Sequence, residues 1–144
     1  MPGRPVAFID TNIWLYAFLD TGEAEKSSHA RAVLTQTEPI LSVQVINEIC
    51  VNLIKKADFT EQQISQLVEA LYEKYPIIEM DEGILLDASQ LRQEYALSFW
   101  DSMVVACALA ANAEILYSED MQDGLVIRDA LEIKNPLTDY SKSS

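Results

Sequence analysis

Short continuous apolar runs alternate along this chain with segments in which apolar residues recur every three or four positions. Continuous runs of four or five apolar residues are typical of strands buried on both faces of a parallel sheet. The periodic segments predict helices with one buried face. We expect strands at 6–9, 39–42, 76–80 and 114–118, with a short last strand at 131–133. We expect helices at 12–19, 23–36, 43–56, around 64–72, at 81–95 and at 101–110.

This alternation predicts an α/β fold, a three-layer α/β/α sandwich around a mainly parallel sheet of four to five strands. The chain has 144 residues and no internal repeat or linker, so we expect a single domain spanning 1–144. Its core should span about 6–136. The last residues, 140–144, are polar and are expected to be a frayed tail.

The segment 101–110 is apolar on all sides, which predicts a helix buried on all sides. The longest uninterrupted apolar run, 103–111, is much shorter than the roughly 20 residues that a membrane span needs. The N-terminus shows no secretory signal, so the expected location is the cytoplasm.

Three carboxylates are predicted to share one edge of the sheet. Asp10 follows the first strand, Asp120 follows the fourth strand, and Asp101 opens the buried helix before the fourth strand. The carboxyl ends of parallel strands meet at one edge, where ligands bind. Clustered carboxylates repel unless a cation joins them, and Mg²⁺ or Mn²⁺ prefers such oxygen ligands. The alternative for Asp10 is that it only caps the helix that follows.

A fourth acid, Glu48, has two interpretations. It falls on the polar side of the helix at 43–56, together with Gln44, Asn47 and Lys55, which is typical of a solvated surface. It also lies near the start of that helix, directly after the second strand, where an anion is favoured. The residues alone leave both interpretations open.

Charge and composition narrow the chemistry. The net charge is −13, from ten Lys and Arg against 23 Asp and Glu, whereas nucleic-acid binders usually carry a basic surface. This net charge has three possible explanations: acids gathered around a metal, a basic protein partner, or a function without nucleic acid.

His29 is the only histidine, which excludes a three-histidine zinc site, and we expect it on the surface. Neither a P-loop nor a dinucleotide-binding glycine motif is present.

Four short blocks of the sequence together resemble the PIN-domain ribonuclease family, most closely the VapC-type toxins of type II toxin–antitoxin systems. The order and spacing of the blocks match, and the resemblance covers about 6–136. The blocks are Ile9-Asp10-Thr11-Asn12-Ile13-Trp14, Asn47-Glu48, Trp100-Asp101-Ser102 and Tyr117-Ser118-Glu119-Asp120.

The resemblance implies an endoribonuclease that uses Mg²⁺ or Mn²⁺ and hydrolyses RNA phosphodiester bonds with metal-activated water. The implied metal ligands and catalytic residues are Asp10, Glu48, Asp101 and Asp120. Thr11 and Asn12 are expected to orient Asp10, and Ser118 to support the fourth acid. Asp123 is a further supporting candidate, and Glu119 is expected to face away from the site.

The resemblance also implies a cognate antitoxin that inserts a segment into the active-site groove, and a homodimer. A basic antitoxin segment would offset part of the negative charge. Two other functions remain open: a catalytically silent PIN-like module that binds proteins, and a metal-dependent phosphoesterase that acts on another substrate. The intact set of four acids argues against the silent module.

Overall fold

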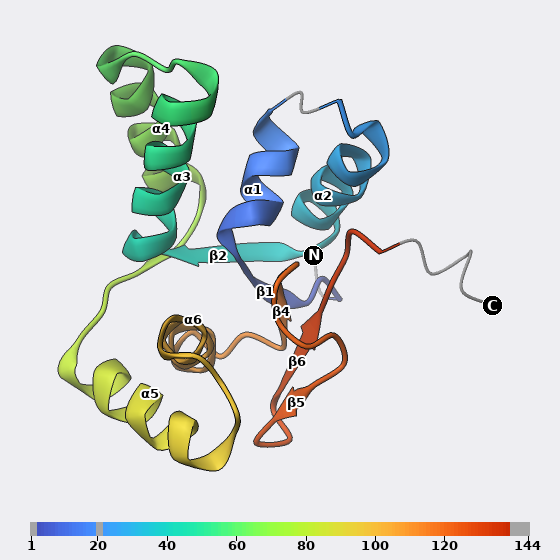
Figure 1. Ribbon diagram of the computed structural model, residues 1–144, viewed down its shortest axis with the longest axis vertical. Coiled ribbons are helices and arrows are strands. Elements are labelled where there is room, and N and C mark those ends of the chain that lie inside the picture. Colours follow the sequence, from blue (N-terminus) through green and yellow to red (C-terminus); the bar gives the residue numbers. More distant parts are fainter. Residues whose placement is uncertain (1–2, 20–21, 139–144) are drawn as a thin grey trace.

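A single mixed sheet forms the centre of the computed structural model, which describes residues 3–19 and 22–138 (Figure 1). Within these ranges the sheet has six strands in the order β3-β2-β1-β4-β6-β5. All neighbouring strands are parallel except β5, which is antiparallel to β6. The strands are β1 (Val6–Ile9), β2 (Glu38–Ser42), β3 (Ile77–Ile78), β4 (Ile115–Tyr117), β5 (Val126–Ile127) and β6 (Leu131–Lys134).

Helices cover both sides of the sheet. Figure 1 shows α1 to α4 on one side and α5 and α6 on the other, so the predicted three-layer α/β/α arrangement is confirmed. The helices are α1 (Thr11–Phe18), α2 (Ala24–Gln36), α3 (Val43–Ala57), α4 (Glu61–Lys74), α5 (Glu82–Glu94) and α6 (Phe99–Ala110). None of the helices in the described ranges is long and apolar enough to span a membrane.

Three details of the predicted elements are wrong. The expected four to five strands omitted β5, a two-residue strand that exists because Val126 and Ile127 pair with β6. Such a strand is too short to show a period of its own. The strand expected at 76–80 is reduced to Ile77–Ile78. Helix α6 begins at Phe99, two residues before Asp101, which lies in its first turn.

The core lies between the central strands and the helices packed on them. Ala7, Phe8 and Ile9 of β1 are fully buried, as their continuous apolar run predicts. Seven consecutive residues of α6, from Ser102 to Ala108, are also buried, which agrees with a helix apolar on all sides. The tail expected at 140–144 lies outside the described residues.

The register of the two central strands determines what meets at the sheet edge. Strands β1 and β4 run parallel, with Ile9 opposite Tyr117. Each strand ends at that residue, so Asp10 and Ser118 follow the paired residues side by side. The backbone N–H of Asp10 continues the pairing by donating to the Tyr117 carbonyl at 3.0 Å.

Candidate active site

Asp10 stands where β1 ends and α1 begins, and it serves as the N-cap of α1. Its Oδ1 accepts a 2.9 Å hydrogen bond from the backbone N–H of Thr11. Its Oδ2 accepts a 3.0 Å hydrogen bond from the hydroxyl of Ser118, at the end of β4. Asp10 therefore does cap α1, as one interpretation predicted. The same carboxylate also lies at the sheet edge beside Ser118, so the two interpretations are compatible.

The environment of Asp10 disfavours its negative charge. Burial raises the pKa of this carboxyl group from 3.8 to about 6, although the hydrogen bonds from Thr11 and Ser118 act in the opposite direction. The neighbouring carboxylates of Glu48 and Asp120 raise the pKa further. Burial and the repulsion between neighbouring carboxylates therefore both favour the neutral form of Asp10.

Glu48 faces this site from α3, although its helix position alone favoured solvent. The Thr11 hydroxyl donates a 2.8 Å hydrogen bond to Glu48 Oε2, and Gln44 Nε2 donates one of 3.2 Å to Oε1. Asn52 donates to the backbone carbonyl of Glu48 at 2.8 Å. The polar side of α3 is thus a wall of the site.

Asp120 lies in the segment after β4. Its Oδ2 accepts a 3.0 Å hydrogen bond from Asn12 Nδ2, and its backbone N–H donates to Ser118 Oγ at 3.3 Å. The supporting contacts differ from the predicted ones. Asn12 donates to the carboxylate of Asp120 and not to that of Asp10. The Ser118 hydroxyl donates to the carboxylate of Asp10, and it accepts from the backbone N–H of Asp120.

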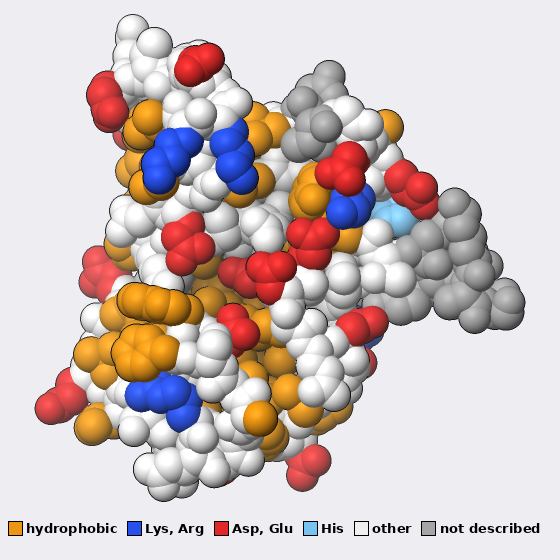
Figure 2. Space-filling view, viewed as in Figure 1, with side chains coloured by type: hydrophobic (Ala, Val, Ile, Leu, Met, Phe, Trp, Pro, Cys, Tyr) orange, Lys and Arg blue, Asp and Glu red, His pale blue; other side chains and the backbone are white. Residues whose placement is uncertain are grey.

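Asp101 completes the group from the first turn of α6. Its backbone N–H donates to the N-cap hydroxyl of Ser98 at 3.1 Å, which fixes the start of the helix. Side chains from four separate parts of the chain line one pocket of about 160 Å³. Figure 2 shows acidic side chains gathered in the middle of this face. The acids that line the pocket are Asp10, Glu48, Asp101 and Asp120.

Two other acids of this region point elsewhere. Asp123 Oδ1 accepts a 3.0 Å hydrogen bond from the backbone N–H of Asn135, and Asp123 does not line the acidic pocket. Glu119 forms a 3.1 Å ion pair with Lys26, as expected for a residue that faces away from Asp120. The structure therefore brings together the four predicted acids with Thr11 and Asn12, and leaves Asp123 outside.

The donor atoms of this pocket suit a hard divalent cation. All four charged groups are carboxylates, the ligands that Mg²⁺ and Mn²⁺ prefer. Burial chiefly raises the pKa of Asp10, the nearby Glu48 and Asp120 carboxylates add to the effect, and a cation would offset this charge repulsion. Among the described residues, however, no three acidic, histidine or cysteine side chains already stand in a metal-ligating arrangement. The chemistry of the residues nevertheless fits such an ion.

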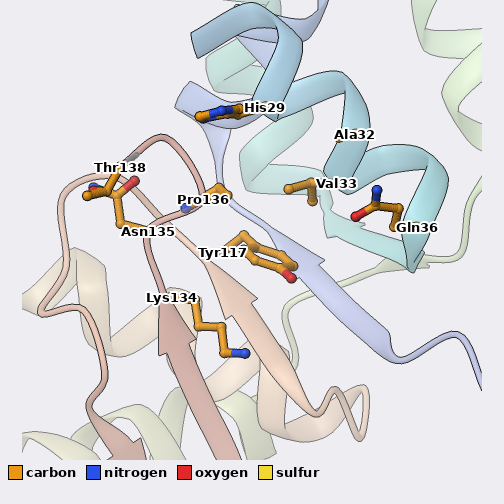
Figure 3. A pocket seen from close by; sticks show the side chains of 9 residues that line it. All are labelled: His29, Ala32, Val33, Gln36, Tyr117, Lys134, Asn135, Pro136 and Thr138. Atoms are coloured by element: carbon orange, nitrogen blue, oxygen red, sulfur yellow. The ribbon is translucent and has the colours of Figure 1, made fainter. Parts of the chain in front are cut away.

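A second, larger pocket lies apart from the acids. It has a volume of about 390 Å³ and lies between α2 and the segment that follows β6 (Figure 3). His29 lines this pocket and is half-buried, whereas we expected it on the surface. Its Nδ1 has no hydrogen-bond partner within the described ranges. None of the four acids lines this pocket, so it carries no part of their chemistry.

The sequence interpretation did not assign to the site four residues that line the acidic pocket, namely Gln44, Asn52, Trp100 and Val104. Gln44 and Asn52 belong to α3, and their spacing of four residues on either side of Glu48 placed all three on one helix face. That spacing could have identified them. Trp100 lines the pocket beside Asp101 and is largely exposed, which no periodic pattern indicated.

Comparisons with known proteins agree with this architecture. The family model for the PIN domain matches residues 7–122. A toxin–antitoxin complex from Klebsiella pneumoniae contains a chain that is 25% identical, with a TM-score of 0.66, covering 90% of this chain and 97% of that one. No curated protein matches the sequence.

Two more distant structures share the fold. VapC20 from Mycobacterium tuberculosis, a sarcin-ricin loop cleaving toxin, is 15% identical with a TM-score of 0.62, covering 79% of this chain and 89% of that one. VapBC2 from Rickettsia felis, bound to a promoter DNA fragment, is 18% identical with a TM-score of 0.62, covering 90% and 98%. At these identities the likeness establishes the fold alone.

Proposed function

The chain belongs to the PIN domain family, and from this we propose that it is a metal-dependent endoribonuclease, the toxin of a toxin–antitoxin pair. One observation carries the proposal: four carboxylates from separate parts of the chain line a single pocket. Gathering so many like charges in one pocket is costly for a structural role, because they repel. A site that recruits Mg²⁺ or Mn²⁺ to a phosphodiester accounts for them.

The four acids, Asp10, Glu48, Asp101 and Asp120, would hold Mg²⁺ or Mn²⁺, whose charge would activate a water molecule and stabilise negative charge on the phosphate. The protein groups around them supply orientation. Thr11 and Ser118 hold the two oxygens of Asp10. These contacts constrain the carboxylate of Asp10 before a substrate arrives, which reduces the cost of organising that part of the site.

A protein nucleophile does not fit this site. Cys107 lies away from the acidic pocket, and burial raises the pKa of its thiol to about 11, so the reactive thiolate is disfavoured. His29 lines the other pocket. Hydrolysis by water, with the acids as ligands, is the chemistry that the residues support.

The similarity to toxin–antitoxin complexes supports a cognate antitoxin as partner. A net charge of −13 favours a basic antitoxin segment inserted into the acidic pocket. We further propose a homodimer in the cytoplasm, with single-stranded RNA as the substrate. Asp123, outside the pocket, is not included among the site residues of this proposal.

Cleavage of a mixed single-stranded RNA pool by the purified chain tests the proposal. Reactions contain Mn²⁺, Mn²⁺ with excess EDTA, or Mn²⁺ with the Asp10→Asn variant, and Asp123→Asn serves as a matched control from outside the pocket. We expect cleavage by the wild type and by Asp123→Asn in Mn²⁺ only. Equal cleavage by Asp10→Asn would refute the site.

A parallel reaction with p-nitrophenyl phosphate separates the ribonuclease from a general phosphoesterase. Turnover of the small ester without RNA cleavage would overturn the substrate assignment. Absence of both activities, with intact folding by circular dichroism, would favour a silent protein-binding module.

A further inference from the structure

Two aromatic side chains stand exposed at the rim of the acidic pocket. Trp100 is 64% exposed and Phe99 is 53% exposed, although residues of this size are usually buried. Trp100 itself lines the pocket and is adjacent to Asp101 in the sequence. Figure 2 shows hydrophobic side chains exposed next to the acidic group on this face.

The aromatic pair of Phe99 and Trp100 is held in place by a contact between its rings and by contacts with Arg92. The two rings meet edge to face, with centroids 5.2 Å apart and an interplanar angle of 82°. The Arg92 guanidinium lies over the Phe99 ring, 4.5 Å from its centroid. Arg92 donates a hydrogen bond to the hydroxyl of buried Ser102, which in turn donates to the Phe99 carbonyl, both at 2.6 Å. A supported, exposed indole loses little conformational entropy when a ligand covers it.

The charge of the protein limits how it can hold RNA. It carries only ten Lys and Arg against 23 acids, so phosphate contacts can supply little of the affinity. Among the described residues, three of these cations, Lys26, Arg128 and Lys134, already form ion pairs with carboxylates. Stacking of a base on an aromatic ring does not need positive charge, and it tolerates any base.

We infer that Trp100, supported by Phe99 and Arg92, is a stacking platform for an unpaired nucleobase of the substrate next to the scissile phosphate. This inference rests on the proposed ribonuclease function. Because Trp100 and the four acids line one pocket, a nucleotide with its phosphate among the acids has a base within reach of the indole. Bases in a duplex are already stacked on their neighbours, so the platform selects single-stranded RNA.

Intrinsic fluorescence gives a direct test, because Trp14 is fully buried and Trp100 is largely exposed. Mixing the wild type with a short single-stranded RNA in MgCl₂ should quench the emission on binding, before turnover. Binding of the same labelled RNA is followed independently by fluorescence anisotropy. RNA binding without any quenching would overturn the inference.

Variants then separate stacking from a structural role. We expect Trp100→Ala to weaken RNA binding and lower kcat/KM by about 5- to 100-fold, and Trp100→Phe to retain most of both. Leu86→Ala is the matched control, because Leu86 is also an exposed apolar residue, at 65%, and lies outside the pocket. An effect of Trp100→Ala no larger than that of Leu86→Ala would overturn the inference.

An RNA with one abasic nucleotide, placed at each position in turn, completes a double-mutant cycle. At the stacked position the missing base should weaken binding to the wild type and cause no further loss with Trp100→Ala. Full additivity at every position would overturn the platform.

The remaining outcomes distinguish this inference from the function on which it rests. RNA cleavage with no dependence on Trp100 would keep the ribonuclease and refute the platform. Neither binding nor cleavage of RNA would refute both. A change in oligomeric state with Trp100→Ala, without any change in RNA binding, would refute stacking and assign the aromatic pair to a protein contact.

Discussion

Thr11 Oγ1 donates a 2.8 Å hydrogen bond to Glu48 Oε2, which joins the first turn of α1 to the polar side of α3. The backbone N–H of Thr11 also donates to Asp10 Oδ1. One residue therefore orients two of the four acids, and its own side chain is buried with 6% of its surface exposed. Glu48 remains an exposed helix residue, and this contact holds its carboxylate at the acidic pocket.

Replacing Thr11 by valine should lower RNA cleavage by about 10- to 100-fold, because Glu48 loses the group that orients it. Valine keeps the shape of threonine, so the free energy of unfolding should fall by only about 1 kcal/mol. The measurements are kcat/KM in Mn²⁺ and urea unfolding of each variant. Thr11→Ser keeps the hydroxyl and should retain most activity. Equal losses in both variants would contradict an orienting role for the hydroxyl.

The raised pKa of Asp10 makes stability depend on pH in a specific direction. Its pKa is 3.8 when unfolded and about 6 when folded. Between these pH values the unfolded state has lost a proton that the folded state keeps. The contribution of Asp10 to the free energy of unfolding is therefore fully present below about pH 4 and is lost as pH rises through 6. The loss is no more than about 3 kcal/mol.

Asp10→Asn isolates this contribution from those of the other acids. We expect the variant to gain stability over the wild type as pH rises from 4 to 6, in buffer with EDTA, and the difference to be constant above that range. Urea unfolding at each pH measures it. A stability difference that is the same at pH 4 and pH 7 would show that Asp10 is not destabilised by its environment.

Ser118 and Asp123 offer a paired test of which residues after β4 support the site. Ser118→Ala removes the hydroxyl that donates to Asp10 and should lower cleavage by about 10- to 100-fold. Losing that hydrogen bond should also raise the pKa of Asp10, which moves the pH dependence of cleavage upward. Asp123→Asn keeps an oxygen that can accept from the Asn135 N–H, and its cleavage rate should match the wild type. A larger loss from Asp123→Asn would place Asp123 in the site.

Local patterns of the sequence determined the layers of this fold. The apolar run of β1 is short, continuous and followed by a carboxylate, and the structure makes it a buried strand with Asp10 at its end. The segment from Ser102 to Ala108 is apolar on all sides, and the structure makes it a buried helix. Apolar patterns and capping residues are local features of the sequence, so the elements that they specify can be predicted without knowledge of the packing.

The composition of the site was also predictable, because carboxylates that follow parallel strands must meet at one edge. Asp10 and Asp120 are such residues, and both line the pocket. The resemblance to PIN domains added Glu48, which the residues alone left open between solvent and site.

Tertiary structure decided the contacts between distant segments. The partners of Asn12 and Ser118 depend on the register of β1 and β4, 108 residues apart. The prediction paired Asn12 with Asp10 and not with Asp120, and it paired Ser118 with Asp120 but missed its hydrogen bond to Asp10. Strand β5 forms only because β6 offers a partner. Trp100 lies in the first turn of α6, and only the packing around that turn leaves it exposed at the acidic pocket. A sequence specifies which side chains are available, whereas helix packing and strand register determine which of them touch.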